Sequence, residues 1–279
     1  NALVNDQLGR MRNFYGDQRL VDHFINTAGR PIRFARYTSR TLYPGIRTSK
    51  KDGRKLASIN HFFVNELNNL NDPNEKEDAE IFIQQLKEKG KWPAKYDIKD
   101  WFGRKGEDWI DRRTGIPRRA IPNEKDSELL TRWEVQNYCP DILITNYSML
   151  EYMMLRPIER PIFESIQAWL NLDPTNKILF IIDEAHLYKG AQGTEVAYLL
   201  RRFAARLNIT SDRIQFILTS ASFDENDKKN DPIKFASELT GTDPKSFEII
   251  KGELNLQENE ANGSEDDLRV LSDINLSKF

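Results

Sequence analysis

The chain has 279 residues, of which 39% are hydrophobic and 30% are charged, so it can form a real core beneath a heavily charged surface. Its formal net charge of -2 excludes binding of nucleic acid through overall basic charge, and a phosphate-binding surface must be a local patch. The lone cysteine, Cys139, excludes an intrachain disulfide, and no apolar run reaches the roughly 18 residues that span a bilayer. No signal peptide opens the sequence, so we expect a cytoplasmic protein.

The first part of the chain predicts two helices and a strand. Apolar residues recur at helical spacing over 2–14, and a second helical pattern covers 17–26. Residues 31–37 alternate in character, as in a strand. Residues 38–56 are rich in Thr, Ser, Gly, Arg and Lys and contain the turn signal Pro44-Gly45, which predicts a loop.

Residues 57–125 break this rhythm. Helical patterns cover 58–71 and 75–89, and residues 90–122 place Trp92, Trp101 and Trp109 among many charges, glycines and prolines. We interpret 57–125 as a helical and irregular insertion. Its tryptophans, with Trp133 beyond it, could stack on bases, but we favour the core of a small subdomain.

Regular alternation returns at residue 126. Helical patterns are found at 127–138, 147–154, 158–170, 193–207 and 232–239, and strand patterns at 141–145, 177–182, 215–218 and 246–251. The strand at 177–182 is apolar throughout, as expected at the centre of a parallel sheet. This order predicts an α/β fold with a doubly wound, mostly parallel sheet. We assign 1–56 and 126–252 to one lobe, and 253–279 to a linker or to the start of the next region.

Four polar clusters directly follow predicted strands, at the sheet edge where ligands bind in such folds. They are Thr38-Ser39-Arg40-Thr41, Thr145-Asn146, Asp183-Glu184-Ala185-His186 and Thr219-Ser220-Ala221-Ser222. Phosphoryl transfer to water needs a cation at the phosphates and a group that orients the water. Asp183 suits the first role through Mg²⁺, Glu184 suits the second, and His186 can contact a neighbouring element.

Simpler interpretations exist for each feature. An Asp-Glu pair is often a helix N-cap, and Thr219 and Ser220 could cap a turn. The basic residues Arg10, Arg12, Arg33, Arg36 and Arg40, with those at 47–55, form either a solvated face or a phosphate-binding patch. His186 is too close to Glu184 for the His-Glu-x-x-His geometry of a zinc site, and the chain has three histidines in all. We therefore interpret His23 and His61 as ordinary surface or packing residues and Cys139 as a buried small residue.

The third and fourth clusters, each after an apolar strand, resemble motifs II and III of the superfamily 2 DEAD/DEAH-box helicases. Residues 1–7 resemble the end of motif Ia, and 141–150 is similar to the motif Ib region. Residues 36–41 match the strand and loop between them, with Ser39 where relatives often carry glycine. The helix after the box, at 189–202, is similar to a bacterial group that includes DNA-repair helicases and helicases of phage-defence systems.

The resemblance covers about 1–45 and 126–252 and implies the first RecA-like lobe of a P-loop NTPase, with ATP and Mg²⁺ as cofactors and DNA as substrate. Catalytic roles fall on Asp183, Glu184 and His186, and coupling roles on Thr219, Ser220 and Ser222. The nucleic-acid contacts that it implies are Asn1, Gln7, Thr38, Arg40, Thr41, Thr145 and Asn146.

One motif of the family is missing. No Gly-x-x-x-x-Gly-Lys-[Ser/Thr] occurs in the sequence, and we expect this phosphate-binding loop upstream of Asn1. The second lobe and its arginine finger are expected elsewhere too. We therefore do not expect the 279 residues to hydrolyse ATP unaided.

Two alternatives stay open. The lobe could serve a non-unwinding double-strand translocase or a loading platform in a multi-protein defence or repair complex, with 57–125 as a docking surface for protein partners. It could instead be a nucleotide-binding domain of a transporter or signalling ATPase, for which oligonucleotide binding would be weak and independent of salt.

Overall fold

The computed structural model of the chain describes residues 2–41, 123–220 and 231–250. It also describes eight single residues, Asn74, Glu77, Ile81, Gln84, Gln85, Glu88, Ala94 and Arg113. Most of 57–125, all of 253–279, and the predicted site residues Asn1 and Ser222 lie outside the described residues.

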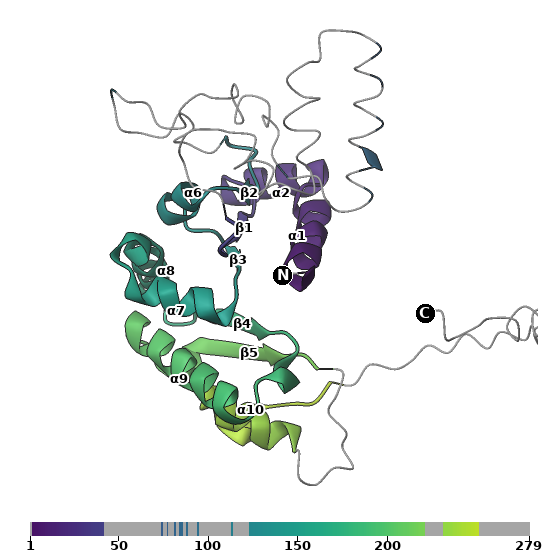
Figure 1. Cartoon of the computed structure of the whole chain (residues 1–279). Coiled ribbons are helices and arrows are strands. Elements are labelled where there is room, and N and C mark those ends of the chain that lie inside the picture. Colours follow the sequence, from purple (N-terminus) through teal and green to yellow (C-terminus); the bar gives the residue numbers. More distant parts are fainter. Residues whose placement is uncertain are drawn as a thin grey trace, which may run out of the picture.

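The N-terminal part contains helices α1 (Ala2–Tyr15) and α2 (Gln18–Ala28) and strand β1 (Phe34–Arg36) (Figure 1). Asp17 caps α2, since its side chain accepts a hydrogen bond from the backbone N–H of Arg19 at 2.9 Å. Gly29 ends the helix with φ at 75°, a conformation that glycine adopts without a steric cost.

The later part begins with β2 (Glu128–Leu129), α6 (Arg132–Asn137) and β3 (Ile142–Ile144), and continues through α7 (Tyr147–Leu155), the 3-10 turn η2 (Pro157–Glu159) and α8 (Arg160–Leu172). Then follow β4 (Ile178–Ile182), η3 (Ala185–Leu187), α9 (Gly190–Leu207), η4 (Ser211–Arg213), β5 (Ile214–Leu218), α10 (Pro232–Thr240) and η5 (Pro244–Ser246).

The described strands form two parallel sheets. In the first, the order is β2-β1-β3, with Phe34 opposite both Glu128 and Ile142. In the second, β4 pairs with β5 over five residues, from Ile178 opposite Ile214 to Ile182 opposite Leu218. All carboxyl ends within a sheet therefore meet at one edge, where the polar clusters begin.

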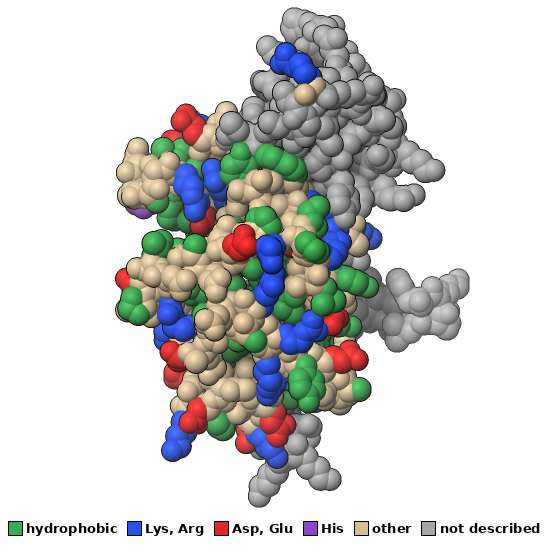
Figure 2. Space-filling model, turned by 90° about the vertical axis from the view of Figure 1, so that its left-hand side faces the viewer, with side chains coloured by type: hydrophobic (Ala, Val, Ile, Leu, Met, Phe, Trp, Pro, Cys, Tyr) green, Lys and Arg blue, Asp and Glu red, His purple; other side chains and the backbone are tan. Residues whose placement is uncertain are grey.

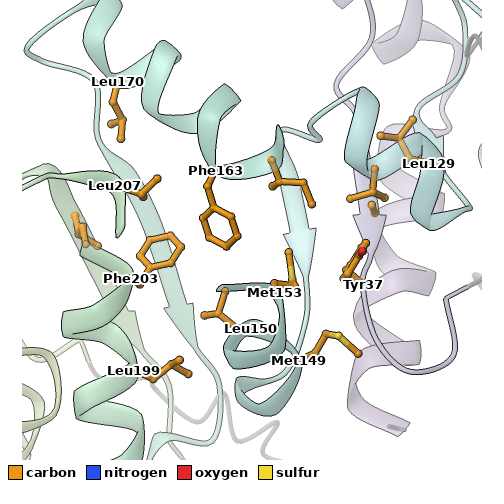
Figure 3. Close-up of a cluster of buried hydrophobic side chains, with 14 residues drawn as sticks. Tyr37, Leu129, Met149, Leu150, Met153, Phe163, Leu170, Leu199, Phe203 and Leu207 are labelled. Carbon is orange, nitrogen blue, oxygen red and sulfur yellow. The ribbon is translucent and has the colours of Figure 1, made fainter. Parts of the chain in front are cut away.

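Helices cover the two sheets unequally (Figure 1). Helix α1 packs on one face of β1 and β3, where Leu8 and Phe34 are buried together. The opposite face meets α6, α7 and α8, and α9 continues this layer over β4 and β5. One hydrophobic cluster runs along the layer, from Tyr37 beside Met149 to Phe163, whose ring meets that of Phe203 at a centroid distance of 6.3 Å (Figure 3).

Strand β4 is less enclosed than its apolar sequence predicts. Ile182 is buried, and Ile178 and Phe180 pack toward α9. On the other face, Leu179 is 52% exposed and Ile181 is 58% exposed. Within the described residues β4 pairs with β5 alone, so the predicted central strand lies at the edge of a two-stranded sheet.

Two predicted elements are wrong. The helix predicted over 127–138 is split, because Glu128 and Leu129 pair with β1 and Thr131 starts α6 with a reciprocal capping box to Glu134. The strand predicted at 246–251 is absent from 246–250, where η5 and irregular chain lead to Ile250, which is 90% exposed. Asp243 caps the Pro244 turn there, so local turn chemistry outweighs the β propensity of the isoleucines.

Candidate nucleotide and nucleic-acid site

The Asp183–His186 segment turns sharply as it leaves β4. Glu184 adopts the left-handed conformation, with φ at 51° and ψ at 45°, which is uncommon for a residue with a side chain. The turn is held to the neighbouring loop, since the Ala185 N–H donates to the Thr219 carbonyl at 2.8 Å and the Thr219 N–H donates to Ile182 at 3.0 Å. The two strand-end clusters are thus fixed against each other through their backbones.

Asp183 faces this neighbouring loop directly. Its Oδ1 accepts hydrogen bonds from the Thr219 hydroxyl and, at 3.1 Å, from the backbone N–H of Glu184. No hydrogen bond to its second oxygen, Oδ2, is found among the described residues. The carboxylate is therefore oriented by one oxygen, while the other can meet a cation.

His186 joins the two clusters through its side chain. Its Nδ1 lies 3.1 Å from the Ser220 hydroxyl and 3.2 Å from Glu184 Oε2. A proton on Nδ1 can be donated to the carboxylate, whereas the other tautomer would accept from Ser220. The histidine thereby contacts a neighbouring element, since it links the loop that follows β4 to the loop that follows β5.

The donor set suits Mg²⁺ better than a metal held by protein alone. Among the described residues no group of three or more His, Cys, Asp or Glu side chains could hold a metal ion. Mg²⁺ commonly takes one or two carboxylates together with waters and substrate phosphates. Asp183, with a half-exposed Glu184 beside it, fits that mode.

The loop after β1 is held by its own threonines. Thr38 and Thr41 are 1% and 2% exposed. The Thr41 hydroxyl donates to the Arg36 carbonyl at 2.7 Å and accepts from the Thr38 N–H at 2.9 Å. Both threonine side chains are thus buried and shape the loop, and the nucleic-acid contact predicted for them stays a prediction. Arg40 is exposed on the same loop.

The segment after β3 is partly engaged as well. The Thr145 hydroxyl donates to the Tyr37 carbonyl at 2.7 Å, which ties the ends of β3 and β1 together. Asn146 is the N-cap of α7, and its Oδ1 accepts from the Met149 N–H at 2.8 Å. Asn146 is exposed, so its amide group and the first turn of α7 remain accessible to a ligand.

The basic cluster near α1 is largely used by the protein itself. Arg12 forms a buried bidentate pair with Glu128, and Arg36 donates to Asn5 at 2.7 Å. Arg10 pairs with Asp6, and Arg33 lies over the Tyr138 ring. These contacts favour a structural role for most of the cluster. Figure 2 shows the side of the molecule away from α1, on which acidic and basic side chains are interspersed.

A buried polar network behind the first sheet was not predicted. The Tyr37 hydroxyl donates to Glu159 at 2.8 Å and accepts from Gln136 at 3.0 Å, and Arg156 also donates to Glu159. Arg132 lies over the Tyr37 ring and donates to the Thr38 carbonyl at 3.0 Å. The network positions the loop after β1. No local pattern predicts that Glu159, which follows Pro157 and Ile158, is fully buried.

Gln7 is partly exposed near the middle of α1. Cys139 was predicted to be buried but is only partly buried; burial still raises the pKa of its thiol to about 11, so this cysteine is protonated at neutral pH. None of the described helices has the length and apolar character needed to cross a bilayer.

The amino-acid sequence of the chain is similar to that of Druantia protein DruE from Escherichia coli. The two sequences are 42% identical over 268 residues, which is 90% of the chain but 14% of the relative. An uncharacterized ATP-dependent helicase of Methanocaldococcus jannaschii is 29% identical over 125 residues, 45% of the chain and 16% of that protein. No protein-family model and no solved structure matches the chain.

Proposed function

We propose that the chain is the first RecA-like motor lobe of an ATP-driven nucleic-acid helicase or translocase, with DNA as its substrate. The observation that carries the proposal is the junction at the ends of β4 and β5. There Asp183, Glu184 and His186 are held against Thr219 and Ser220 by backbone and side-chain hydrogen bonds. Similarity of part of the chain to an ATP-dependent helicase supports it.

In this proposal the nucleotide is ATP with Mg²⁺. Asp183 binds the cation through Oδ2, directly or through its waters, and Glu184 orients or deprotonates the attacking water. His186 transmits changes between the two strand ends through Ser220. The phosphate-binding loop and the arginine that faces it come from other parts of the full-length protein, since these 279 residues contain no Gly-x-x-x-x-Gly-Lys-[Ser/Thr].

The nucleic acid is proposed to lie along the ends of β1 and β3. Arg40, Thr145, Asn146 and Gln7 are the predicted contacts that are at least partly exposed, and they are proposed to contact the phosphate backbone rather than the bases. The proposal includes membership of a bacterial DNA-repair or phage-defence system, which the sequence resemblance supports. A docking role for 57–125 concerns a segment that lies mostly outside the described residues.

The decisive experiment is Glu184→Gln in the full-length protein. We expect nucleic-acid-stimulated ATP hydrolysis to fall by about 10²–10⁴-fold, the usual contribution of a general base, while ATP binding is kept. Glu164→Gln is the matched control, because it neutralises an exposed glutamate on α8 that is remote from the strand ends. Unchanged hydrolysis in Glu184→Gln contradicts the catalytic assignment.

A second measurement separates the two forms of the proposal. A helicase displaces one strand of a duplex in an ATP-dependent manner. A double-strand translocase or loading platform hydrolyses ATP in response to nucleic acid without displacement. Binding that is weak and insensitive to salt contradicts both, because phosphate contacts release counterions and must depend on salt.

A further inference from the structure

Two tyrosines connect the candidate nucleotide site to the candidate nucleic-acid site. Tyr147 directly follows Thr145-Asn146, and Tyr188 follows Asp183–His186 by two residues. Their rings meet edge to face, with centroids 6.2 Å apart and planes at 83°. This is a favoured geometry for an aromatic pair, and both residues are partly buried.

The pair connects the two parallel sheets across the break between β3 and β4. Strand β3 pairs with β1 and strand β4 pairs with β5, and no hydrogen-bond ladder joins β3 to β4 in the part of the chain that the structure describes. Tyr147 packs against both hydrophobic clusters, the one that runs along the helix layer past both sheets and the one around Ile182 at the end of β4. A movement at the end of β3 can therefore reach the end of β4 through these side chains.

Tyr188 is firmly placed relative to the carboxylates. Its N–H donates to the Ala185 carbonyl at 3.0 Å. Its carbonyl oxygen lies against Gly193, where an added Cβ would come within 2.5 Å of that oxygen. The first turn of α9 therefore packs closely against the backbone of Tyr188. Burial raises the pKa of the Tyr188 phenol, and Tyr147 and then Asp183 add to this effect, as expected for a ring near the Asp183 carboxylate.

Tyr147 is equally well placed relative to the nucleic-acid segment. It is the first residue of α7, immediately after the N-cap Asn146. A phosphate oxygen that binds Asn146 or the N–H groups of this first turn acts on the cap hydrogen bond to Met149. The turn that responds to the phosphate is thus the turn that carries the Tyr147 ring.

We propose that Tyr147 and Tyr188 are positioning residues that transmit nucleic-acid binding at Thr145-Asn146 to the Asp183-Glu184 pair. The inference rests on the proposed function. The phosphate shifts the first turn of α7, the Tyr147 ring moves against Tyr188, and Tyr188 adjusts the strand-end turn that holds Glu184. The rings touch neither nucleotide nor nucleic acid in this role.

The test measures ATP hydrolysis of the full-length protein with and without a single-stranded DNA oligonucleotide, together with the ATP KM and the DNA concentration for half-maximal stimulation. Tyr147→Leu removes the ring contact, and Tyr147→Phe keeps it. Tyr188→Leu breaks the same contact from the other side, and serves on its own if Tyr147→Leu fails to fold. Tyr138→Leu is the matched control, because it removes a partly buried tyrosine from a similar edge-to-face pair, with Trp133, before β3.

We expect Tyr147→Leu to lower the stimulation by DNA about fivefold or more, a typical size for coupling between two sites. Its unstimulated rate and its ATP KM stay within about twofold of the wild type. Tyr147→Phe and Tyr138→Leu keep the stimulation. The double variant Tyr147→Leu/Tyr188→Leu is no worse than the more affected single variant, because both act through one contact.

Two results overturn the inference in different ways. Wild-type protein that DNA does not stimulate contradicts the proposed function, and the inference with it. Stimulated wild-type protein with normal stimulation in Tyr147→Leu, or with additive losses in the double variant, contradicts the inference alone.

Discussion

The two described sheets are built from similar apolar strands but are enclosed very differently. In the first sheet, Phe34 and Ala35 of β1 are fully buried on opposite faces, one toward α1 and the other toward the layer of α6 to α8. In the second, α9 covers one face of β4 and β5, and Leu179, Ile181 and Ile217 are exposed on the other. A strand sequence typical of a buried parallel sheet thus has two different environments in one chain.

The difference shows which of the two sheets has both faces covered by helices of the described chain. Parallel sheets are normally covered on both faces, and a contiguous exposed apolar face marks a contact surface. The first sheet meets this requirement with helices of the described chain and adds the buried ion pair of Arg12 and Glu128. The second does not meet it within the described residues. The chain spans only 14% of its DruE relative, and more polypeptide in such a protein could cover this face.

The largest effect is expected at the ion pair that locks α1 to the first sheet. Arg12 donates from Nε and Nη2 to both oxygens of Glu128, at 2.9 and 2.8 Å, and the two side chains are 9% and 2% exposed. Arg12→Met removes this bidentate partner from a buried carboxylate, and we expect a loss of about 3–5 kcal/mol in the free energy of unfolding. Urea denaturation measures it.

The double variant Arg12→Met/Glu128→Leu is the control for this prediction. Replacing both partners with apolar residues removes the uncompensated charge and should recover much of the loss. If the double variant is as unstable as Arg12→Met, shape rather than charge fixes α1 to the sheet.

Adjacent isoleucines of β4 test the comparison most directly. Ile182 is 6% exposed beneath α9, and Ile181 is 58% exposed on the uncovered face. We expect Ile182→Ala to cost about 2–4 kcal/mol and Ile181→Ala less than about 1 kcal/mol, because the β propensity lost is the same and only burial differs. Thermal or urea unfolding of the 279-residue chain gives both values.

The same pair in the full-length protein shows whether that face is covered there. If it is, Ile181→Ala becomes nearly as costly as Ile182→Ala. Equal costs already in the 279-residue chain contradict the exposed face itself.

A smaller loss is expected at the network behind β1. Glu159 is completely buried and accepts from Tyr37 and Arg156, but Arg156 is 37% exposed and can turn to water. Glu159→Ala should therefore cost about 2–3 kcal/mol, less than breaking a fully enclosed pair. Tyr37→Phe removes one hydrogen bond of the same carboxylate and should cost about 1 kcal/mol in the same unfolding assay. Equal losses contradict a central role for the carboxylate.

Much of the fold follows from local sequence signals. Helical periodicity predicts α1, α2, α7, α8, α9 and α10 to within a few residues, alternation of residue character predicts β1, and apolar runs predict β3, β4 and β5. The failures have physical causes that lie outside a local pattern. Glu128 and Leu129 become a strand because β1 offers them a partner. The exposed face of β4 depends on which helices pack on it, and an apolar run cannot specify this.

The sequence predicts which candidate site residues lie at the ends of strands. It does not predict which of them are buried. The Asp183 and Thr219 clusters are adjacent because consecutive strands pair in parallel. Thr38 and Thr41 were expected to be accessible, yet both are buried, since small hydroxyl residues serve a loop as readily as a ligand. The Tyr147–Tyr188 contact joins residues 41 positions apart and requires the three-dimensional arrangement to be seen.

The smallest effect on the free energy of unfolding is expected at Asn146, where the same variants also test DNA binding most clearly. Its side chain caps α7, so Asn146→Ala should cost about 1 kcal/mol in unfolding, while Asn146→Asp keeps the cap and adds a negative charge that is favourable at a helix N-terminus. In the full-length protein the order reverses for binding of single-stranded DNA. Asn146→Asp brings a negative charge to the proposed phosphate contact, so it weakens binding more than Asn146→Ala does, and the gap narrows as salt is raised. If Asn146→Asp binds DNA as tightly as the wild type, Asn146 only caps α7 and the nucleic acid lies elsewhere.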